Sequence, residues 1–175
     1  MVEYLNEQLA IENSVAERLV TRIHEVPFSD FKQHLERNLR ETMGRQEMIY
    51  QLIVNLGGKP TDIKATLPAL KTIDSHRSIK ELKDTVESLT DHRKKEAKSA
   101  ENEIHKIKED LMIEKAGAIA YKILLRIAEQ ANIPDVIPIL KQSIEEEEAV
   151  SNWITDNISA MIDQLWSKIE PVLID

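Results

Sequence analysis

Apolar residues in the first part of the chain recur at the three- and four-residue spacing of amphipathic helices. The spacing predicts a helix over about 2–25, ended by Pro27, and a second helix that Ser29 or Asp30 caps and that runs to Leu56. Along the second helix a seam alternates steps of four and three residues: Leu35, Leu39, Thr42, Gln46, Ile49, Ile53 and Leu56. Because the link around Pro27 is short, the two helices are expected to form an antiparallel hairpin.

A long connection follows. Gly57-Gly58 and then Pro60 form a strong helix stop, and irregular chain is expected over 59–75. A shorter amphipathic helix is predicted over about 76–90, and the apolar residues on one of its faces are Ile79, Leu82, Val86 and Leu89.

The last part of the chain predicts a second pair of long helices. They cover about 97–131 and 136–168, and Pro171 is expected to end regular structure. Two hairpins joined by a crossover over about 59–96 are typical of a ferritin-like four-helix bundle. We therefore expect an all-α fold of one domain, residues 1–175, with an extra helix in the crossover.

Composition narrows the classes of function. The 175-residue chain has no cysteine, which excludes disulfides and metal–thiolate sites. The net charge of −8 argues against non-specific binding to nucleic acid. No long uncharged run or signal-like N-terminus is present, so a transmembrane or secreted protein is not expected and the cytoplasm is the default location.

Three of the predicted long helices carry a glutamate in the middle of an apolar stripe, namely Glu12, Glu114 and Glu147. At about 100° per residue, each points the same way as its apolar neighbours. A buried ionised carboxylate costs several kcal/mol unless a cation or hydrogen bonds meet it. Di-iron and di-manganese bundle proteins gather such carboxylates because hard oxygen donors bridge two metal ions. The pattern therefore predicts a possible iron or manganese site.

The chain departs from the usual ligand pattern of these sites. They use Glu-x-x-His on two helices, whereas here Glu41 is followed by Gly44 and Glu147 by Val150. Glu41 stays a candidate ligand from the second helix, although it lies about 100° from the centre of the seam.

Arg45 makes the prediction ambiguous, because a guanidinium in the core could pair with Glu12 or Glu147 and replace the metal. Asn38 shares its flank of the seam. Three arrangements remain open. The glutamates bind metal, their helices turn so that they face solvent, or they join a metal-free buried network with Arg45, Thr42, Gln46 and Tyr121.

Several other side chains are weaker candidates. His34 could be a metal ligand, but a boundary or surface histidine is the favoured interpretation. Tyr121 could donate a hydrogen bond to a core carboxylate or be an ordinary buried tyrosine. Trp153 and Trp166 are expected on the far side of the last helix, against the crossover or a partner subunit.

No catalytic Ser-His-Asp or Cys-His arrangement and no glycine-rich phosphate loop is recognisable. Apolar positions beyond the needs of a four-helix core favour a two-fold homodimer, and they are Met48, Leu52, Leu124, Ile127, Trp153 and Trp166.

Three stretches carry a family resemblance: His34-Leu35-Glu36 through Glu41-Thr42 to the run 55–60, Glu114 with the run 118–121, and Ile139-Leu140 through Ile144 to Glu146-Glu147. Together they resemble the stress-induced ferritin-like proteins of the YciF type. The resemblance implies a ferritin-like bundle, usually dimeric, with a possible dinuclear metal centre and a link to stress.

Two classes of function are therefore expected. In the first, Glu12, Glu114 and Glu147 hold iron or manganese, and the protein handles oxygen or peroxide. In the second, the protein is a metal-free helical scaffold or stress-associated interaction protein, in which Arg45 neutralises the carboxylates.

Overall fold

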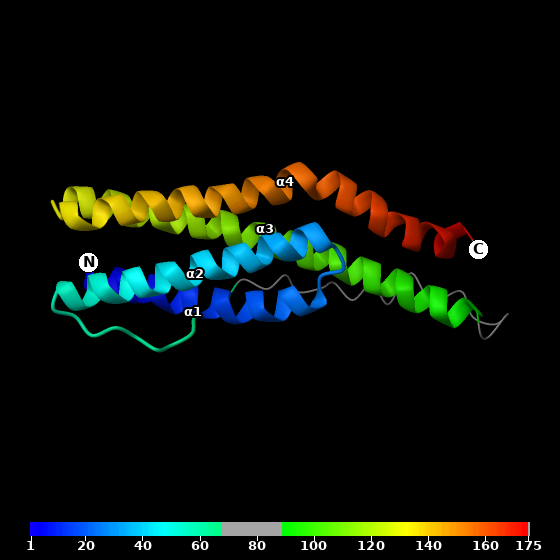
Figure 1. The fold of residues 1–175 in the computed structure, drawn as a ribbon, viewed down its shortest axis with the longest axis horizontal. Coiled ribbons are helices and arrows are strands. Elements are labelled where there is room, and N and C mark those ends of the chain that lie inside the picture. The colour runs from blue at the N-terminus through cyan, green and yellow to red at the C-terminus, as the bar shows by residue number, and fades with distance from the viewer. Residues whose placement is uncertain (68–88, 175) are drawn as a thin grey trace. The chain divides into compact units, whose positions relative to one another are not determined.

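The computed structural model describes residues 1–67 and 89–174, and every regular element in these two stretches is helical. The elements are α1 (Val2–Glu25), α2 (Ser29–Asn55), α3 (Leu89–Gln130), a short 3-10 helix (Pro134–Val136) and α4 (Ile137–Ile174) (Figure 1). The prediction of an all-α protein is confirmed for the described residues.

The first two helices follow the prediction except at one cap. The bounds of α1 are those that the sequence predicted. The N-cap of α2, however, is Phe28, and it makes no side-chain cap bond. The prediction of a cap by Ser29 or Asp30 was wrong, because the Ser29 hydroxyl instead donates to the Asp30 carboxylate at 3.2 Å.

The last two helices are longer than predicted. α3 begins at Leu89, because the residues after it include many lysines, glutamates and alanines, which are good helix formers. α4 runs through Pro171 to Ile174. A proline there removes one backbone hydrogen bond near the helix end, while Ile169 just before it is buried. Most of the helix predicted over 76–90 lies outside the described residues.

The chain divides into two compact units. The first comprises Met1–Pro68 and Met112–Trp153, and the second comprises Ala69–Leu111 and Ile154–Asp175. α3 and α4 each contribute to both units. All the candidate site residues predicted from the sequence lie in the first unit, so the description of the site concerns that unit alone.

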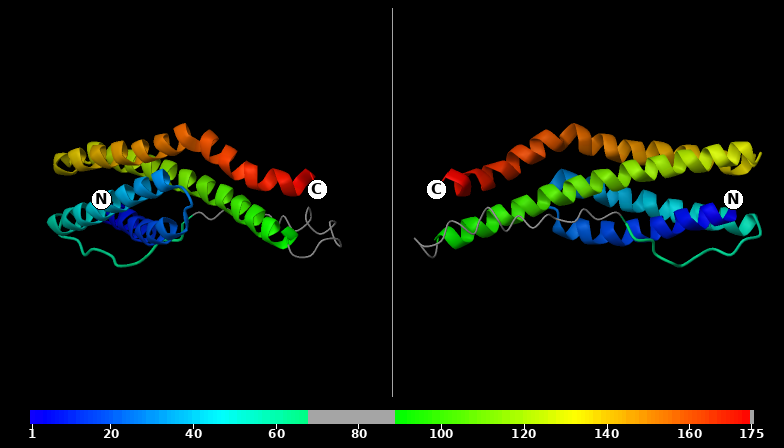
Figure 2. Two further views of the ribbon diagram at one scale, coloured as in Figure 1. Left: turned by 45° about the vertical axis from the view of Figure 1, so that its right-hand side comes forward. Right: turned by 180° about the vertical axis from the view of Figure 1, so that it is seen from behind.

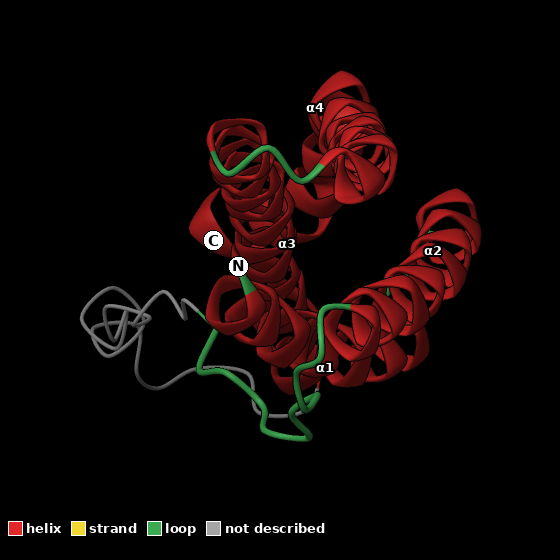
Figure 3. Ribbon diagram, turned by 90° about the vertical axis from the view of Figure 1, so that its left-hand side faces the viewer, coloured by secondary structure: helices red, strands yellow, loops and turns green. Residues whose placement is uncertain are grey.

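Within the first unit, α1 and α2 lie side by side as the predicted antiparallel hairpin (Figure 2). The end-on view of Figure 3 shows the loop that leads from α3 into α4. All four helices contribute to one hydrophobic core, whose buried residues are Leu5, Leu9, Ile49, Leu52, Ile53, Tyr121, Leu124, Ala128, Val136, Leu140 and Ile144. Leu52 and Leu124 therefore pack inside the unit. The prediction that the four-helix core does not use them, and that they are available for a dimer interface, was wrong.

Left-handed residues end two of the helices in the same way. Gly57 has φ +77°, and the Gly58 amide donates to the Ile53 carbonyl at 2.8 Å. At the end of α3, Asn132 has φ 53°, and the Ile133 amide donates to the Ala128 carbonyl at 3.0 Å. Both are Schellman motifs, which satisfy the last carbonyls and turn the chain sharply.

The 59–67 segment is irregular, as predicted, but it is fastened along α1. Asn6 accepts from the Thr61 amide at 2.8 Å, and the Asn13 side chain donates to the Ile63 carbonyl at 3.0 Å. The Ser14 hydroxyl donates to the Ala65 carbonyl at 2.6 Å. These polar side chains recur on one face of α1, so they satisfy backbone groups of a segment that makes no helix of its own.

Candidate functional site

The three glutamates in the predicted seams are all buried. Glu12 on α1 is 2% exposed, and Glu114 on α3 and Glu147 on α4 are each 4% exposed. The interpretation that left these carboxylates in solvent was therefore wrong. The helical spacing that placed them on apolar stripes was sufficient to predict their burial.

Arg45 of α2 lies fully buried among these carboxylates. Its Nε lies 3.2 Å from Glu12 Oε2, and one terminal nitrogen lies 2.6 Å from Glu147 Oε1. The other terminal nitrogen lies 3.1 Å from Glu146 Oε2, which is partly exposed. Burial opposes the charge of Arg45, but the charges of Glu12 and Glu147 outweigh it and raise the pKa of the guanidinium above its usual value.

Thr42 completes the contacts of Arg45. The same guanidinium nitrogen that meets Glu147 donates to Thr42 Oγ1 at 3.0 Å. Thr42 and Arg45 are three residues apart on α2, so they share one helix face. The guanidinium therefore has a hydrogen-bond acceptor for each of its nitrogens, which is the condition for keeping a buried cation stable.

Glu12 is held by two neutral donors as well as by Arg45. The Tyr121 hydroxyl donates to Glu12 Oε1 at 2.6 Å, and Gln8 Nε2 donates to the same oxygen at 3.0 Å. Burial and the charge of Glu12 raise the pKa of Tyr121 well above its usual value, so the tyrosine remains a donor at neutral pH. The sequence suggested the role of Tyr121 but not that of Gln8, which lies one turn before Glu12 and is buried with it.

Glu114 has fewer partners. Asn38 Nδ2 donates to Glu114 Oε1 at 2.9 Å, while Glu114 Oε2 and Asn38 Oδ1 are buried and have no hydrogen-bond partner among the described residues. Burial raises the pKa of Glu114 to about 7, against the opposing charge of Arg45. Burial and then the charge of Glu114 raise the pKa of Glu147 well above its usual range. At neutral pH the two carboxyls therefore retain a proton between them.

Gly117 allows α3 and α4 to approach at this point. A Cβ atom placed on Gly117 would lie 2.9 Å from the carboxyl carbon of Glu147. A side chain there would displace the carboxyl that meets Arg45. Because no apolar pattern marks this glycine, its role could not be predicted from the sequence.

The network thus offsets part of its negative charge with the protein's own groups. Arg45 neutralises Glu12, and a retained proton removes one of the charges of Glu114 and Glu147. Gln46, which was considered for this network, instead donates to Asn13 at 2.8 Å outside it.

His34 is buried, so the interpretation of a boundary or surface histidine was wrong. Its ring stacks on Trp153 of α4 with centroids 4.3 Å apart and an angle of 12° between planes. Trp153 also stacks on Phe31 at 5.5 Å. Burial and the charge of Arg37 lower the pKa of His34 to about 4, so the ring is neutral at pH 7.

Two further expectations for the site therefore fail. Trp153 faces α2 and not the far side of α4, because the aromatic side chains of α2 provide its packing surface. Glu41 lies away from the carboxylate network, half-buried, with its oxygen 3.5 Å from Arg37 one turn earlier on α2.

The donor set does not fit a dinuclear metal centre. No group of three histidine, cysteine, aspartate or glutamate side chains in the described stretches is arranged to hold a metal ion. Thr42 and Arg45 have the spacing of a Glu-x-x-His pair on α2, and Glu147 and Val150 have it on α4. The guanidinium occupies the space between the carboxylates, and a second positive charge beside it would be repelled.

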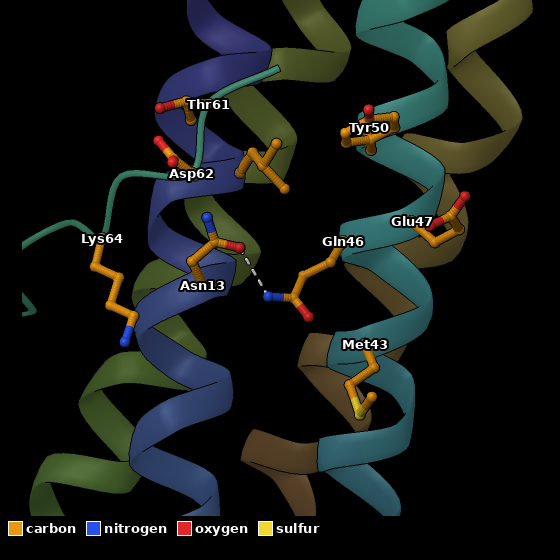
Figure 4. Close-up of a pocket in the computed structure, with 9 residues that line it drawn as sticks. Asn13, Met43, Gln46, Glu47, Tyr50, Thr61, Asp62 and Lys64 are labelled. Atoms are coloured by element: carbon orange, nitrogen blue, oxygen red, sulfur yellow. Dashed lines mark hydrogen bonds between the residues drawn. The ribbon is translucent and has the colours of Figure 1, made fainter.

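A separate groove opens between α1, α2 and the 59–67 segment, with a volume of about 550 Å³ (Figure 4). The Asn13–Gln46 hydrogen bond crosses it, and Met43 and Tyr50 border it on the α2 side. Except for the buried Leu9, its lining side chains are exposed or half-buried, and none of the three buried glutamates lines it. None of the helices in the described residues is long and apolar enough to span a membrane.

The first unit is therefore a helical bundle whose core holds a buried network of carboxylates around one arginine. The chain belongs to the family described as "Domain of unknown function (DUF892)", a family of the ferritin-like type, whose model matches residues 1–166. Neither the curated proteins nor the solved structures contain a match to the chain.

Proposed function

We propose that this protein is a metal-independent, ferritin-like helical bundle that acts as a scaffold or interaction module. The proposal selects the second of the two classes of function expected from the sequence. A role in stress would follow from the resemblance to YciF-type proteins.

The observation that carries the proposal is the environment of Arg45. A guanidinium in contact with Glu12, Glu146 and Glu147 occupies the space where a bundle metal would bind. Arginine is never deprotonated under physiological conditions, so this charge is permanent. The usual imidazole ligands are also missing at the spacing that such sites use.

Metal analysis tests the proposal directly. The protein is purified from cells grown with added iron and manganese, and a second sample is reconstituted anaerobically with ferrous iron. We expect substoichiometric metal in both samples and an unchanged unfolding temperature, since a ligand at a hundred times its dissociation constant would add about 2.7 kcal/mol. Stoichiometric metal that raises the unfolding temperature would refute the proposal.

The same experiment tests a second candidate function, that of an iron- or manganese-binding protein that handles oxygen or peroxide. A specific observation favours it: Glu114 Oε2 and Asn38 Oδ1 are buried oxygen atoms without a hydrogen-bond partner among the described residues. A hard cation accepts such oxygen donors. Metal that binds to the native chain but not to an Asn38→Leu, Glu114→Gln variant would support this candidate.

A further inference from the structure

An unusual apolar stripe runs along the outside of the first unit. On α3, Met112 is 41% exposed, Ile119 is 58% exposed and Ile123 is 57% exposed. Together with the exposed Ala116, these positions alternate steps of four and three residues, which is the spacing of a coiled-coil seam. We call the four residues Met112, Ala116, Ile119 and Ile123 the α3 seam.

The exposed charged residues of α3 within the span of the seam are basic, although the acidic Glu129 and Glu148 lie beside them. Every exposed charged residue of α3 from 112 to 128 is basic, namely Lys115, Lys122 and Arg126. At about 100° per residue these three lie on the same flank of the seam. This is a local reversal in a chain whose net charge is −8.

Two of the basic residues already have acidic neighbours. Lys122 Nζ lies 2.5 Å from Glu148 of α4, and Arg126 lies 3.0 Å from Glu129. All of these side chains are exposed, and exposed ion pairs of this kind are weak and exchangeable. The flank can therefore accept further acidic groups at low cost.

We propose that the α3 seam docks an amphipathic helix of a partner protein whose flank is acidic. The inference rests on the proposed function, because it names the kind of partner that such an interaction module binds. The apolar seam would contribute the buried area, and Lys115, Lys122 and Arg126 would select for glutamate or aspartate on the incoming helix.

The charge pattern disfavours a second copy of this chain on the same seam. An antiparallel two-fold pair of α3 helices would set the basic flank of one copy against the basic flank of the other. Like charges at that distance repel. An acidic helix of another protein removes this repulsion.

The test uses two designed helical peptides of about three heptads with leucine at the seam positions. One carries glutamate at the flanking positions and the other carries lysine at the same positions. Fluorescence anisotropy measures their binding to the full chain. We expect the glutamate peptide to bind about tenfold or more tightly than the lysine peptide, and its affinity to fall as salt is added.

Variants separate the seam from other exposed apolar residues. Ile119→Ser with Ile123→Ser is expected to weaken binding about tenfold, whereas the matched control on α2, Met43→Ser with Val54→Ser, should leave it unchanged. Lys115→Glu with Arg126→Glu should reverse the preference between the peptides. Equal binding of the two peptides, an equal loss in the α2 control or an unreversed preference would overturn the proposal.

Two other molecules could cover the α3 seam, a second copy of this chain or a membrane surface, and further measurements on the same variants test for both. Sedimentation velocity of the native chain and of the Ile119→Ser, Ile123→Ser variant shows whether a second copy covers the seam. A dimer that the variant converts to monomer would overturn the proposal, as would seam-dependent binding to phosphatidylglycerol vesicles. Metal content is measured on the same samples and tests the proposed function separately. A protein that contains metal and still prefers the acidic peptide would refute metal independence but not the docking of the peptide.

Discussion

Arg45 illustrates how one buried side chain can set the chemistry of a bundle core. Each of its guanidinium nitrogens has an oxygen partner at 2.6–3.2 Å, and these partners come from α1, α2 and α4. A buried ion pair adds little stability compared with an apolar pair, but removal of one member leaves the other charge buried and unpaired. Arg45 therefore matters chiefly because its removal would lower the free energy of unfolding, and not because the ion pair itself adds much stability.

Arg45→Met should destabilise the protein by on the order of 3–5 kcal/mol, because Glu12 and Glu147 would lose their buried cation. Urea unfolding at pH 7, followed by circular dichroism, measures the change. Arg45→Lys should give a smaller loss, because one ammonium group keeps the charge but cannot meet acceptors on three helices.

Arg40→Met is the matched control on the same helix. Arg40 is exposed, so its replacement should change the free energy of unfolding by less than about 0.5 kcal/mol. Similar effects of Arg40→Met and Arg45→Met would contradict the role assigned to the buried guanidinium.

The carboxyls of Glu114 and Glu147 predict an unusual dependence of stability on pH. Both have pKa values that are raised in the folded state, so the folded protein holds their protons more tightly than the unfolded chain does. For Glu114 the stabilisation is complete at pH values below the usual carboxyl pKa of 4.5 and is lost as pH rises through about 7. The free energy of unfolding should therefore fall by on the order of 1–3 kcal/mol between these pH values as Glu114 ionises.

Glu114→Gln isolates this contribution. Glutamine keeps an oxygen for Asn38 and does not ionise, so the variant should lose less stability than the native chain between pH 5 and pH 8 in urea titrations. Glu41→Gln, which replaces a half-buried carboxyl outside the network, is the matched control. Parallel profiles for Glu114→Gln and the native chain would disprove the buried titration.

At the scale of the helices, the ends of α2 and α3 depend on left-handed residues. Gly57 has φ +77°, where a Cβ atom is disfavoured, and Gly58 has the Val2 side chain within 2.5 Å of where its Cβ would lie. Gly44, by contrast, lies in the middle of α2 and has no atom within 4 Å of such a Cβ. The same residue type therefore has opposite consequences at the end and in the middle of one helix.

Gly57→Ala should lower the free energy of unfolding by roughly 1–2 kcal/mol, the cost of a left-handed residue with a side chain. Gly44→Ala should raise it by about 0.5–1 kcal/mol, because alanine loses less backbone entropy in a helix. Thermal unfolding of the two variants beside the native chain measures both effects. If both changes shift stability in the same direction, the turn geometry assigned to Gly57 is wrong.

At the scale of the whole molecule, the two compact units can be followed separately because each contains one tryptophan. Trp153 belongs to the first unit and packs on His34 and Phe31. Trp166 belongs to the second unit and is exposed on α4. Among the described residues, the second unit has fewer large buried apolar side chains than the first. Its local stability should accordingly be lower.

Fluorescence of Trp166→Phe reports on the first unit alone, and fluorescence of Trp153→Phe reports on the second. We expect the Trp166 signal to change at a lower urea concentration than the Trp153 signal, because transitions that do not coincide are the mark of separate cooperative units. Circular dichroism of each variant controls for effects of the substitution itself. Superimposable fluorescence curves would show that the chain unfolds as one unit.

The sequence was sufficient for the helices and for the centre of the network. Periodicity placed Glu12, Glu114 and Glu147 on apolar stripes, and the position of Arg45 beside the seam made a contact with Glu12 or Glu147 one of the arrangements left open. These features depend on local spacing, which a single sequence records.

Other features depend on contacts between distant segments, and local spacing does not reveal them. Gly117 matters because Glu147 lies opposite it, and His34 is buried because Trp153 covers it. The continuation of α4 through Pro171 to Ile174 was likewise not predicted, because a proline near a helix end removes only one backbone hydrogen bond.

The attachment of the central cation to the chain itself has a consequence for how the protein matures. A metal ion must be acquired after synthesis, dissociates at a rate of its own and can be removed by a chelator. The guanidinium of Arg45 arrives with translation, in a fixed ratio of one per chain, and dilution cannot remove it. Under the proposed metal independence, a cell starved of iron or manganese would still assemble this core in full.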